Sequence, residues 1–168
     1  VYNTQTTTCS GSASGTVSLF LRNDSVQWIN TNWFELEIGG VWYRIETEWF
    51  NAAASGAYEA PTYDGQGGAL EVRDFDANRW LRFDNVNLLN GVVRFRLRAD
   101  SPHSGSLSLR VGSPTATPFC TLSWTGVQVY SSQEVACSVP VSGVQTVYLT
   151  NDSVQWINVN WFMLERTG

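Results

Sequence analysis

A long internal repeat sets the organisation of this chain. Residues 19–37 read LFLRNDSVQWINTNWFELE, and residues 147–165 read VYLTNDSVQWINVNWFMLE. The match continues upstream at one constant offset without a gap, so the period is the size of a domain and not of a solenoid repeat. We therefore expect residues 1–40 to be the tail of a preceding unit and residues 41–168 to be a complete second unit, as in a tandem array.

The tail needs a surface on which to bury its tryptophans, because an isolated strand pair is marginally stable in water. The sequence leaves three arrangements open for it. It packs on the second unit, it exchanges between two molecules in a strand-swapped dimer, or the folding unit begins at residue 1. We expect packing against the second unit.

Composition and patterning predict an all-β fold. The chain has eight Trp and one Met, and it is rich in Val, Thr and Ser, which favour strands. Three segments alternate strictly between apolar and polar residues, so that Val93, Phe95 and Leu97, for example, should face inward while the residues between them face water. These segments are residues 79–86, 92–100 and 106–113. We expect a two-sheet antiparallel β-sandwich of the jelly-roll kind.

The charge and the hydropathy of the chain argue against two classes of partner. The net charge of −5 and the pI of about 4.7 argue against a general nucleic-acid binder, which must neutralise phosphates. No apolar run is long enough to span a membrane. All ten basic residues are arginines, and seven of them fall between Arg73 and Arg110.

The three cysteines predict one disulfide. Closing the loop between Cys120 and Cys137 would contribute about 3 kcal/mol in the chain-entropy model. Cys9 is the repeat counterpart of Cys137, so its own partner would lie in the preceding unit. Three free thiols are the alternative. A disulfide favours an extracellular, secreted protein.

The second unit resembles a known family. Five segments carry the resemblance: IETEWF, DFDANRW, RFRLRAD, WTGVQVY and WINVNWFMLE, in this order between residues 43 and 168. They are similar to the family 6 carbohydrate-binding modules, which are β-sandwiches appended to secreted enzymes that degrade polysaccharides. The resemblance implies a non-catalytic polysaccharide-binding function.

The same resemblance implies a structural calcium ion. Its ligands would be Glu46, Glu48 and Asn160, the last of which replaces the aspartate of the family. Calcium prefers several hard oxygen ligands, and a neutral amide should make the site weaker. The alternative is that the two glutamates form a solvated strand face.

The family binds sugars at two places, and the first is a cleft at the loop end. There a Tyr and a Trp clamp the sugar ring over an Asn. This chain has Asp74 in place of the Tyr and Val127 near the position of the Trp, and only Asn158 matches. The resemblance therefore implies sugar contacts from Asp74 and Asn158 without the usual aromatic clamp.

The second place is the face of a sheet, where Trp80 matches the tryptophan of the family. We expect a row of outward arginines beside it: Arg82, Arg94, Arg96, Arg98 and Arg110. Planar guanidinium groups bind carboxylate or sulfate, which favours an acidic or sulfated glycan over a neutral β-glycan. The alternative is that nearby carboxylates pair with these arginines, namely Asp74, Asp76, Asp84, Asp100 and Glu71, with Arg98 mainly structural.

Other functions have less support. The single histidine, His103, has no nucleophile with catalytic spacing. Glu46 and Glu48 are two residues apart, which predicts one strand face and suits a shared cation better than the opposed carboxylates of a glycosidase. We predict a polysaccharide-binding module that targets a secreted enzyme to its substrate. The alternative class is a structural or adhesive tandem repeat of a surface protein.

Overall fold

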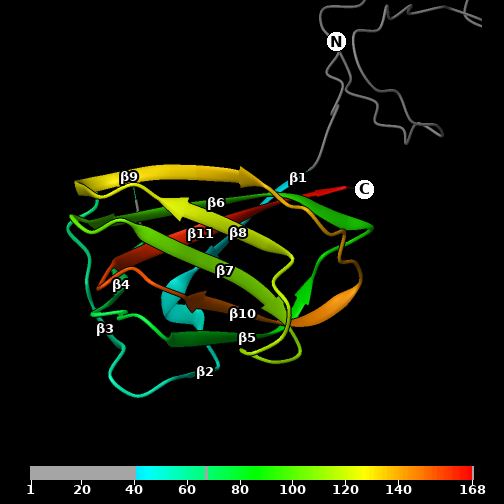
Figure 1. Cartoon of the computed structure of the whole chain (residues 1–168), viewed down its shortest axis with the longest axis horizontal. Helices are drawn as coiled ribbons and strands as arrows, with labels where there is room; N and C mark the ends of the chain where they lie inside the picture. The colour runs from blue at the N-terminus through cyan, green and yellow to red at the C-terminus, as the bar shows by residue number, and fades with distance from the viewer. Residues whose placement is uncertain (1–40, 67, 168) are drawn as a thin grey trace, which may run out of the picture. The chain divides into compact units, whose positions relative to one another are not determined.

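The computed structural model describes residues 41–66 and 68–167. These residues form two antiparallel sheets packed face to face (Figure 1). The strands are β1 (Val41–Glu46), β2 (Ala52–Ala53), β3 (Tyr58–Pro61), β4 (Leu70–Arg73), β5 (Arg79–Asn87), β6 (Gly91–Ser101), β7 (Gly105–Val111), β8 (Cys120–Trp124), β9 (Val127–Ala136), β10 (Val144–Asn151) and β11 (Asn158–Thr167), and the 3₁₀ helix η1 spans Thr47–Trp49. The prediction of an all-β sandwich is confirmed.

The strand order separates the two sheets clearly. The six-stranded sheet, called sheet A below, runs β3-β4-β11-β6-β9, and β1 also pairs with β11. The five-stranded sheet, called sheet B below, runs β2-β5-β10-β7-β8. Leu81 and Leu149 of sheet B and Leu97 and Phe162 of sheet A are fully buried in one common core. The remaining faces of the two sheets look outward, on opposite sides of the sandwich.

The second copy of the repeated segment supplies the middle of both sheets. Residues 147–165 span most of β10 and β11. β10 lies between β5 and β7, and β11 lies between β6 on one side and β4 and β1 on the other. A central strand is paired along both of its edges and packs one face on the core, which favours aromatic and β-branched residues.

The alternation predicted for β6 fails at one position. Phe95 and Leu97 are fully buried, but Val93 is 40% exposed. The register between β6 and β11 shifts at this point, because Arg94 pairs with Glu165 while Val92 pairs with the next residue of β11. The bulge adds one residue and turns Val93 outward.

Two further side chains differ from expectation, one in its place and one in its exposure. β1 ends at Glu46 and Glu48 lies in η1, so the two glutamates do not share one strand face. Ser108 lies on the outer face of its sheet as expected, opposite Thr150, but it is only 1% exposed, and its hydroxyl bonds to Thr121 and Asp152.

The predicted disulfide is present. Cys120 at the start of β8 is bonded to Cys137, with 4.5 Å between their Cα atoms. Cys9, the tail of residues 1–40 and the proposed strand exchange lie outside the described residues. Within the described ranges no helix is long and apolar enough to cross a membrane.

Candidate functional site

A groove of about 690 Å³ lies on the outer face of sheet B. Its lining comes from β5, β7, β10 and two loops: Asn78, Arg79, Trp80, Arg110, Pro114, Thr115, Thr150, Asn151 and Asp152. The strand register explains the grouping, because Thr150 pairs with Trp80 on one side and with Ser108 on the other. Opposed residues in antiparallel strands point to the same face.

The loop between β4 and β5 forms one wall of the groove. Asp74 and Asn78 have positive φ angles of 49° and 65°, a conformation that Asp and Asn tolerate better than most residues. The Arg79 guanidinium pairs with Asp76 at 2.6 Å and donates to the Asp74 carbonyl at 2.9 Å. The Asn151 amide donates to the Phe75 carbonyl at 2.6 Å and fixes this loop to the end of β10.

Arg110 supports the other wall. Its Nη2 donates to Asp152 Oδ1 at 3.0 Å, and its Nε donates to the Thr150 hydroxyl at 3.2 Å. Its Nη1 donates to the Ala116 carbonyl in the β7–β8 loop, which carries Pro114 and Thr115. The guanidinium is thus satisfied by groups of the protein itself and braces the loop.

Trp80 is the large aromatic side chain of the groove. Its ring meets the ring of Tyr148 edge-on, with 5.6 Å between centroids. Tyr148 is 9% exposed and lies between Arg82 and Arg110 in the register. Arg82 pairs with Asp84 at 3.2 Å. A partly exposed indole, fixed by a second ring and flanked by polar groups, is suited to the apolar face of a sugar ring.

The single row of arginines expected beside Trp80 does not exist. Arg82 and Arg110 lie on sheet B, but the arginines of β6 lie on the outer face of sheet A. Arg94 and Arg96 both contact Glu134, at 3.4 and 2.6 Å. The sequence did not show that the chain crosses from one sheet to the other between β5 and β6.

The pairing of arginines with carboxylates, considered as the alternative, is what the structure shows. Of the expected carboxylate partners, Asp84 binds Arg82, and two others bind arginines outside the expected row. These two are Asp76, which binds Arg79, and Glu71, which binds Arg73. The remaining arginines of the row use carboxylates that the sequence did not single out: Glu134, Glu165, Asp64 and Asp152.

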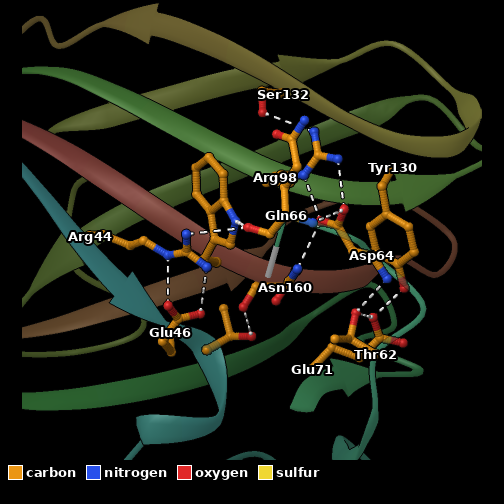
Figure 2. A network of polar contacts seen from close by, with 12 residues as sticks. Arg44, Glu46, Thr62, Asp64, Gln66, Glu71, Arg98, Tyr130, Ser132 and Asn160 are labelled. Carbon is orange, nitrogen blue, oxygen red and sulfur yellow. Dashed lines mark hydrogen bonds and ion pairs between the residues drawn. The ribbon is translucent and has the colours of Figure 1, made fainter. Parts of the chain in front are cut away.

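Arg98 belongs to a buried polar network on sheet A (Figure 2). Its guanidinium donates to both oxygens of Asp64, at 2.5 and 2.7 Å, and the Asn160 amide donates to Asp64 at 2.8 Å. These donors lower the pKa of Asp64 to about 2, against its burial. The Trp161 indole and Arg44 both donate to the Gln66 carbonyl, so the loop that carries Asp64 is held against the sheet.

Asn158 lies at the loop end of sheet A, as the family pattern implies. Its Oδ1 accepts the Asp74 backbone N–H at 3.4 Å, and it pairs with Asp100 of β6. Burial raises the pKa of Asp100. The Tyr130 hydroxyl donates to the buried Glu71, and burial together with this contact raises the pKa of Tyr130. Asn158 and Asp74 are adjacent, but both contribute to internal hydrogen bonds.

The three residues predicted to bind calcium are only partly available. A Cβ at Gly68 would lie 3.2 Å from Glu48 Oε1 and 3.5 Å from Glu46 Oε2, so the glycine leaves space beside both carboxylates. Arg44 holds both oxygens of Glu46, at 2.6 and 3.1 Å. Glu48 Oε2 and Asn160 Oδ1 are buried and accept no hydrogen bond from the described residues.

Within residues 41–66 and 68–167 no three His, Cys, Asp or Glu side chains form a metal-binding group. The buried oxygens of Glu48 and Asn160 are hard donors of the type that calcium prefers, and an unpaired buried carboxylate is costly. Burial and the charge of Glu46 raise the pKa of Glu48, which reflects that cost.

Sequence reasoning missed Thr150 and Asp152, which line the groove, and Tyr148, which packs against Trp80 beside it. Tyr148 and Thr150 are two positions apart on β10 and therefore share its outward face. This spacing, inside the repeated segment, was the available signal. The contribution of the loop with Pro114 and Thr115 depends on tertiary contacts alone.

Comparison with known proteins identifies the family of the chain. A sequence profile described as "Carbohydrate binding module (family 6)" matches residues 48–166. The chain belongs to this family. The module is accordingly non-catalytic and carbohydrate-binding. A search among curated proteins gave no significant match.

Solved structures agree with the family assignment. A family 6 module from Clostridium cellulolyticum in complex with xylose is 27% identical, with a TM-score of 0.66, covering 74% of this chain and 97% of that one. A β-1,3-glucan-binding module from Bacillus halodurans is 24% identical, with a TM-score of 0.67, covering 74% and 96%. A Clostridium stercorarium module in complex with cellobiose is 19% identical, with a TM-score of 0.64, covering 74% and 94%. The last two likenesses show the fold alone.

Proposed function

We propose that this module binds an uncharged polysaccharide in the sheet B groove, with one sugar ring stacked on Trp80, and so targets a secreted enzyme to its substrate. The position of Trp80 is the observation that carries the proposal. Its ring lines the groove, is fixed edge-on by Tyr148 at 5.6 Å, and has Thr150 as its cross-strand neighbour. Aromatic rings with a few fixed polar groups are the usual composition of small-ligand sites.

The charges of the groove favour a neutral glycan over an acidic or sulfated one. Arg110 is neutralised by Asp152 at 3.0 Å, and Arg79 by Asp76 at 2.6 Å. An anionic sugar would have to compete with these carboxylates for the guanidinium groups. The family 6 relative that is 27% identical is in complex with xylose, an uncharged sugar, which supports the same choice.

Affinity electrophoresis of the chain through gels that contain xylan, β-1,3-glucan, hydroxyethylcellulose or alginate tests this proposal. We expect a neutral polymer to retard the chain. The retardation should be the same at low and moderate salt, because salt screens attraction between charges and a neutral polymer carries none. Trp80→Ala should weaken binding about tenfold or more. Trp49→Ala is the matched control, because Trp49 is 63% exposed and does not line the groove.

A second variant separates a loss of the binding site from a loss of the fold. Thr115→Arg adds bulk at the rim of the groove without entering the core, and should also weaken binding. Thermal unfolding would show that each variant is folded. Equal binding by wild type, Trp80→Ala and Thr115→Arg would reject the groove as the site, and salt-sensitive binding to alginate alone would reject the uncharged ligand.

We further propose that calcium binds between Glu48 and Asn160, with Glu46 as a third ligand when Arg44 releases it. The buried, unpaired oxygens of Glu48 and Asn160 and the space at Gly68 support this site. Bound calcium would supply positive charge that holds η1 against β11. The contact of the Thr47 hydroxyl with the Asn160 carbonyl at 2.9 Å already joins these two elements.

Thermal unfolding with calcium and with chelator tests the calcium proposal. A ligand at a hundredfold excess over its Kd stabilises a fold by about 2.7 kcal/mol. We expect calcium to raise Tm, Glu48→Gln to abolish the response, and Arg44→Gln to strengthen it by freeing Glu46. An unchanged Tm in all three proteins would reject the site.

A further inference from the structure

The two arginines that line the sheet B groove are neutralised from different places. Asp152, the partner of Arg110, is itself part of the groove lining. Asp76, the partner of Arg79, belongs to the β4–β5 loop and is not among the lining residues. The charged side chains of the lining are therefore two arginines and one aspartate, and a carboxylate outside the groove brings the sum of their charges to zero.

Contacts other than Asp76 also hold Arg79 in place. Its Nη1 donates to the Asp74 carbonyl at 2.9 Å. Its guanidinium packs against the backbone of Gly56, which has a φ of 95° and where an added Cβ would lie 2.7 Å from Nη2. The contact with Asp76 is made by Nη2. Removing the charge of Asp76 would thus leave the guanidinium at the groove, with Nη2 ready to donate to a ligand.

The guanidinium lies where it would meet the substituents of a bound sugar. Arg79 and Trp80 are consecutive residues at the start of β5, and both line the groove. A sugar ring stacked on Trp80 would therefore have Arg79 beside it. Guanidinium groups bind carboxylates through two parallel hydrogen bonds. With Asp76 present, a carboxylate on the sugar meets a like charge and must displace it from Arg79.

We infer that Asp76 determines the charge specificity of the groove: by neutralising Arg79 it excludes glycans that carry carboxylates and leaves uncharged glycans unaffected. The inference rests on the proposed function, because it assumes that a sugar ring stacks on Trp80. Asp76 acts by penalising the wrong ligand and not by contacting the right one, since it does not line the groove.

Asp76 is also the carboxylate that can be changed without altering the groove itself. Asp152 accepts hydrogen bonds from the side chains of Arg110, Thr150 and Ser108, so its replacement would disturb the lining. The side-chain partner that the structure gives Asp76 is Arg79, and the Asp76 side chain is 40% exposed. Asp76→Asn keeps the shape of the side chain and removes one negative charge.

Titration calorimetry of the full chain with matched pairs of polymers tests the inference. Each pair shares a backbone and differs in charge: xylan and glucuronoxylan, hydroxyethylcellulose and carboxymethylcellulose, and β-1,3-glucan and its carboxymethyl derivative. The readout is the ratio of the two Kd values within a pair. The wild type should prefer the neutral polymer. Asp76→Asn should shift the ratio about tenfold toward the charged polymer, because a charge-assisted hydrogen bond becomes available, and added salt should reduce this gain.

Glu134→Gln is the matched control for the loss of one negative charge. Glu134 is 39% exposed, and its removal frees Arg94 and Arg96 on the outer face of sheet A, away from the groove. This variant should keep the wild-type ratio. Adding Arg79→Gln to Asp76→Asn should abolish the gain. Thermal unfolding would show that each variant is folded, and Asp76→Ser repeats the test if Asp76→Asn is not.

The possible outcomes separate this inference from the proposed function. A wild-type ratio in Asp76→Asn, with neutral binding that Trp80→Ala weakens, would overturn the role of Asp76 and uphold the groove. An equal gain in Glu134→Gln, or a gain that survives Arg79→Gln, would also overturn that role. Neutral binding that Trp80→Ala leaves intact would overturn the groove, and a wild type that prefers the charged polymers would overturn both.

Discussion

The two outer faces of the sandwich use the same pair of groups, arginine and carboxylate, in opposite ways. On sheet A the loop between β3 and β4 supplies Asp64 to Arg98 of β6, and the side chains of Arg98 and Asp64 are 11% and 2% exposed. On sheet B the pair Arg110–Asp152 lies along the open groove, with side chains 17% and 26% exposed. Burial of the carboxylate is the main difference between them.

An arginine row in the sequence therefore does not by itself identify a binding surface. A carboxylate covered by a loop is part of the fold, because a ligand cannot reach it without removing the loop. A pair that lines a groove can orient a hydroxyl group while remaining neutral.

Arg98→Ala should destabilise the module most. It leaves Asp64 buried without its guanidinium partner, and breaking a buried pair from one side costs about 3–5 kcal/mol. Denaturant unfolding followed by tryptophan fluorescence would measure the free energy of unfolding. The groove lies on the other sheet, so sugar binding by the folded fraction should not change. A loss below about 1 kcal/mol would show that the Asp64 network is not structural.

Acid should weaken the same network. The pKa of Asp64 is lowered from 3.8 to about 2 in the folded state, so its contribution is complete above pH 4 and is lost as the pH falls toward 2. The shift corresponds to about 2 kcal/mol. The measurement is the unfolding free energy of wild type and Asp64→Asn between pH 5 and pH 2. Parallel curves for the two proteins would contradict the assignment.

The strands could be predicted from the sequence better than the site. Period-two alternation identified β5, β6 and β7, and Trp80 and Arg110 were correctly placed on outward positions. The bulge at Val93 could not be seen, because one inserted residue leaves no compositional signal. The division of the arginines between the two sheets could not be predicted either, because it depends on where the chain passes over the core after β5.

Strand pairing also creates neighbours that the sequence did not show. Tyr58 and Arg73 belong to separate segments of the chain, and only the β3–β4 register makes them neighbours. Asn158 and Asp74 were found because the family pattern marks their positions, and the structure shows them adjacent. Patterns in one sequence thus predict which residues face outward, while the contacts between segments decide which of them meet.

Arg96→Ala should have the smallest effect on stability and completes the comparison. Arg96 lies on the same strand as Arg98, but it is 34% exposed and pairs with Glu134, which is 39% exposed. Exposed pairs contribute between 0 and 1 kcal/mol because water and salt screen them. We expect a loss of about 0.5 kcal/mol, which added salt reduces further. The stacking of its guanidinium on Trp42 at 4.4 Å is the remaining contribution. If Arg96→Ala were as destabilising as Arg98→Ala, burial would not be what separates structural from surface arginines on this face.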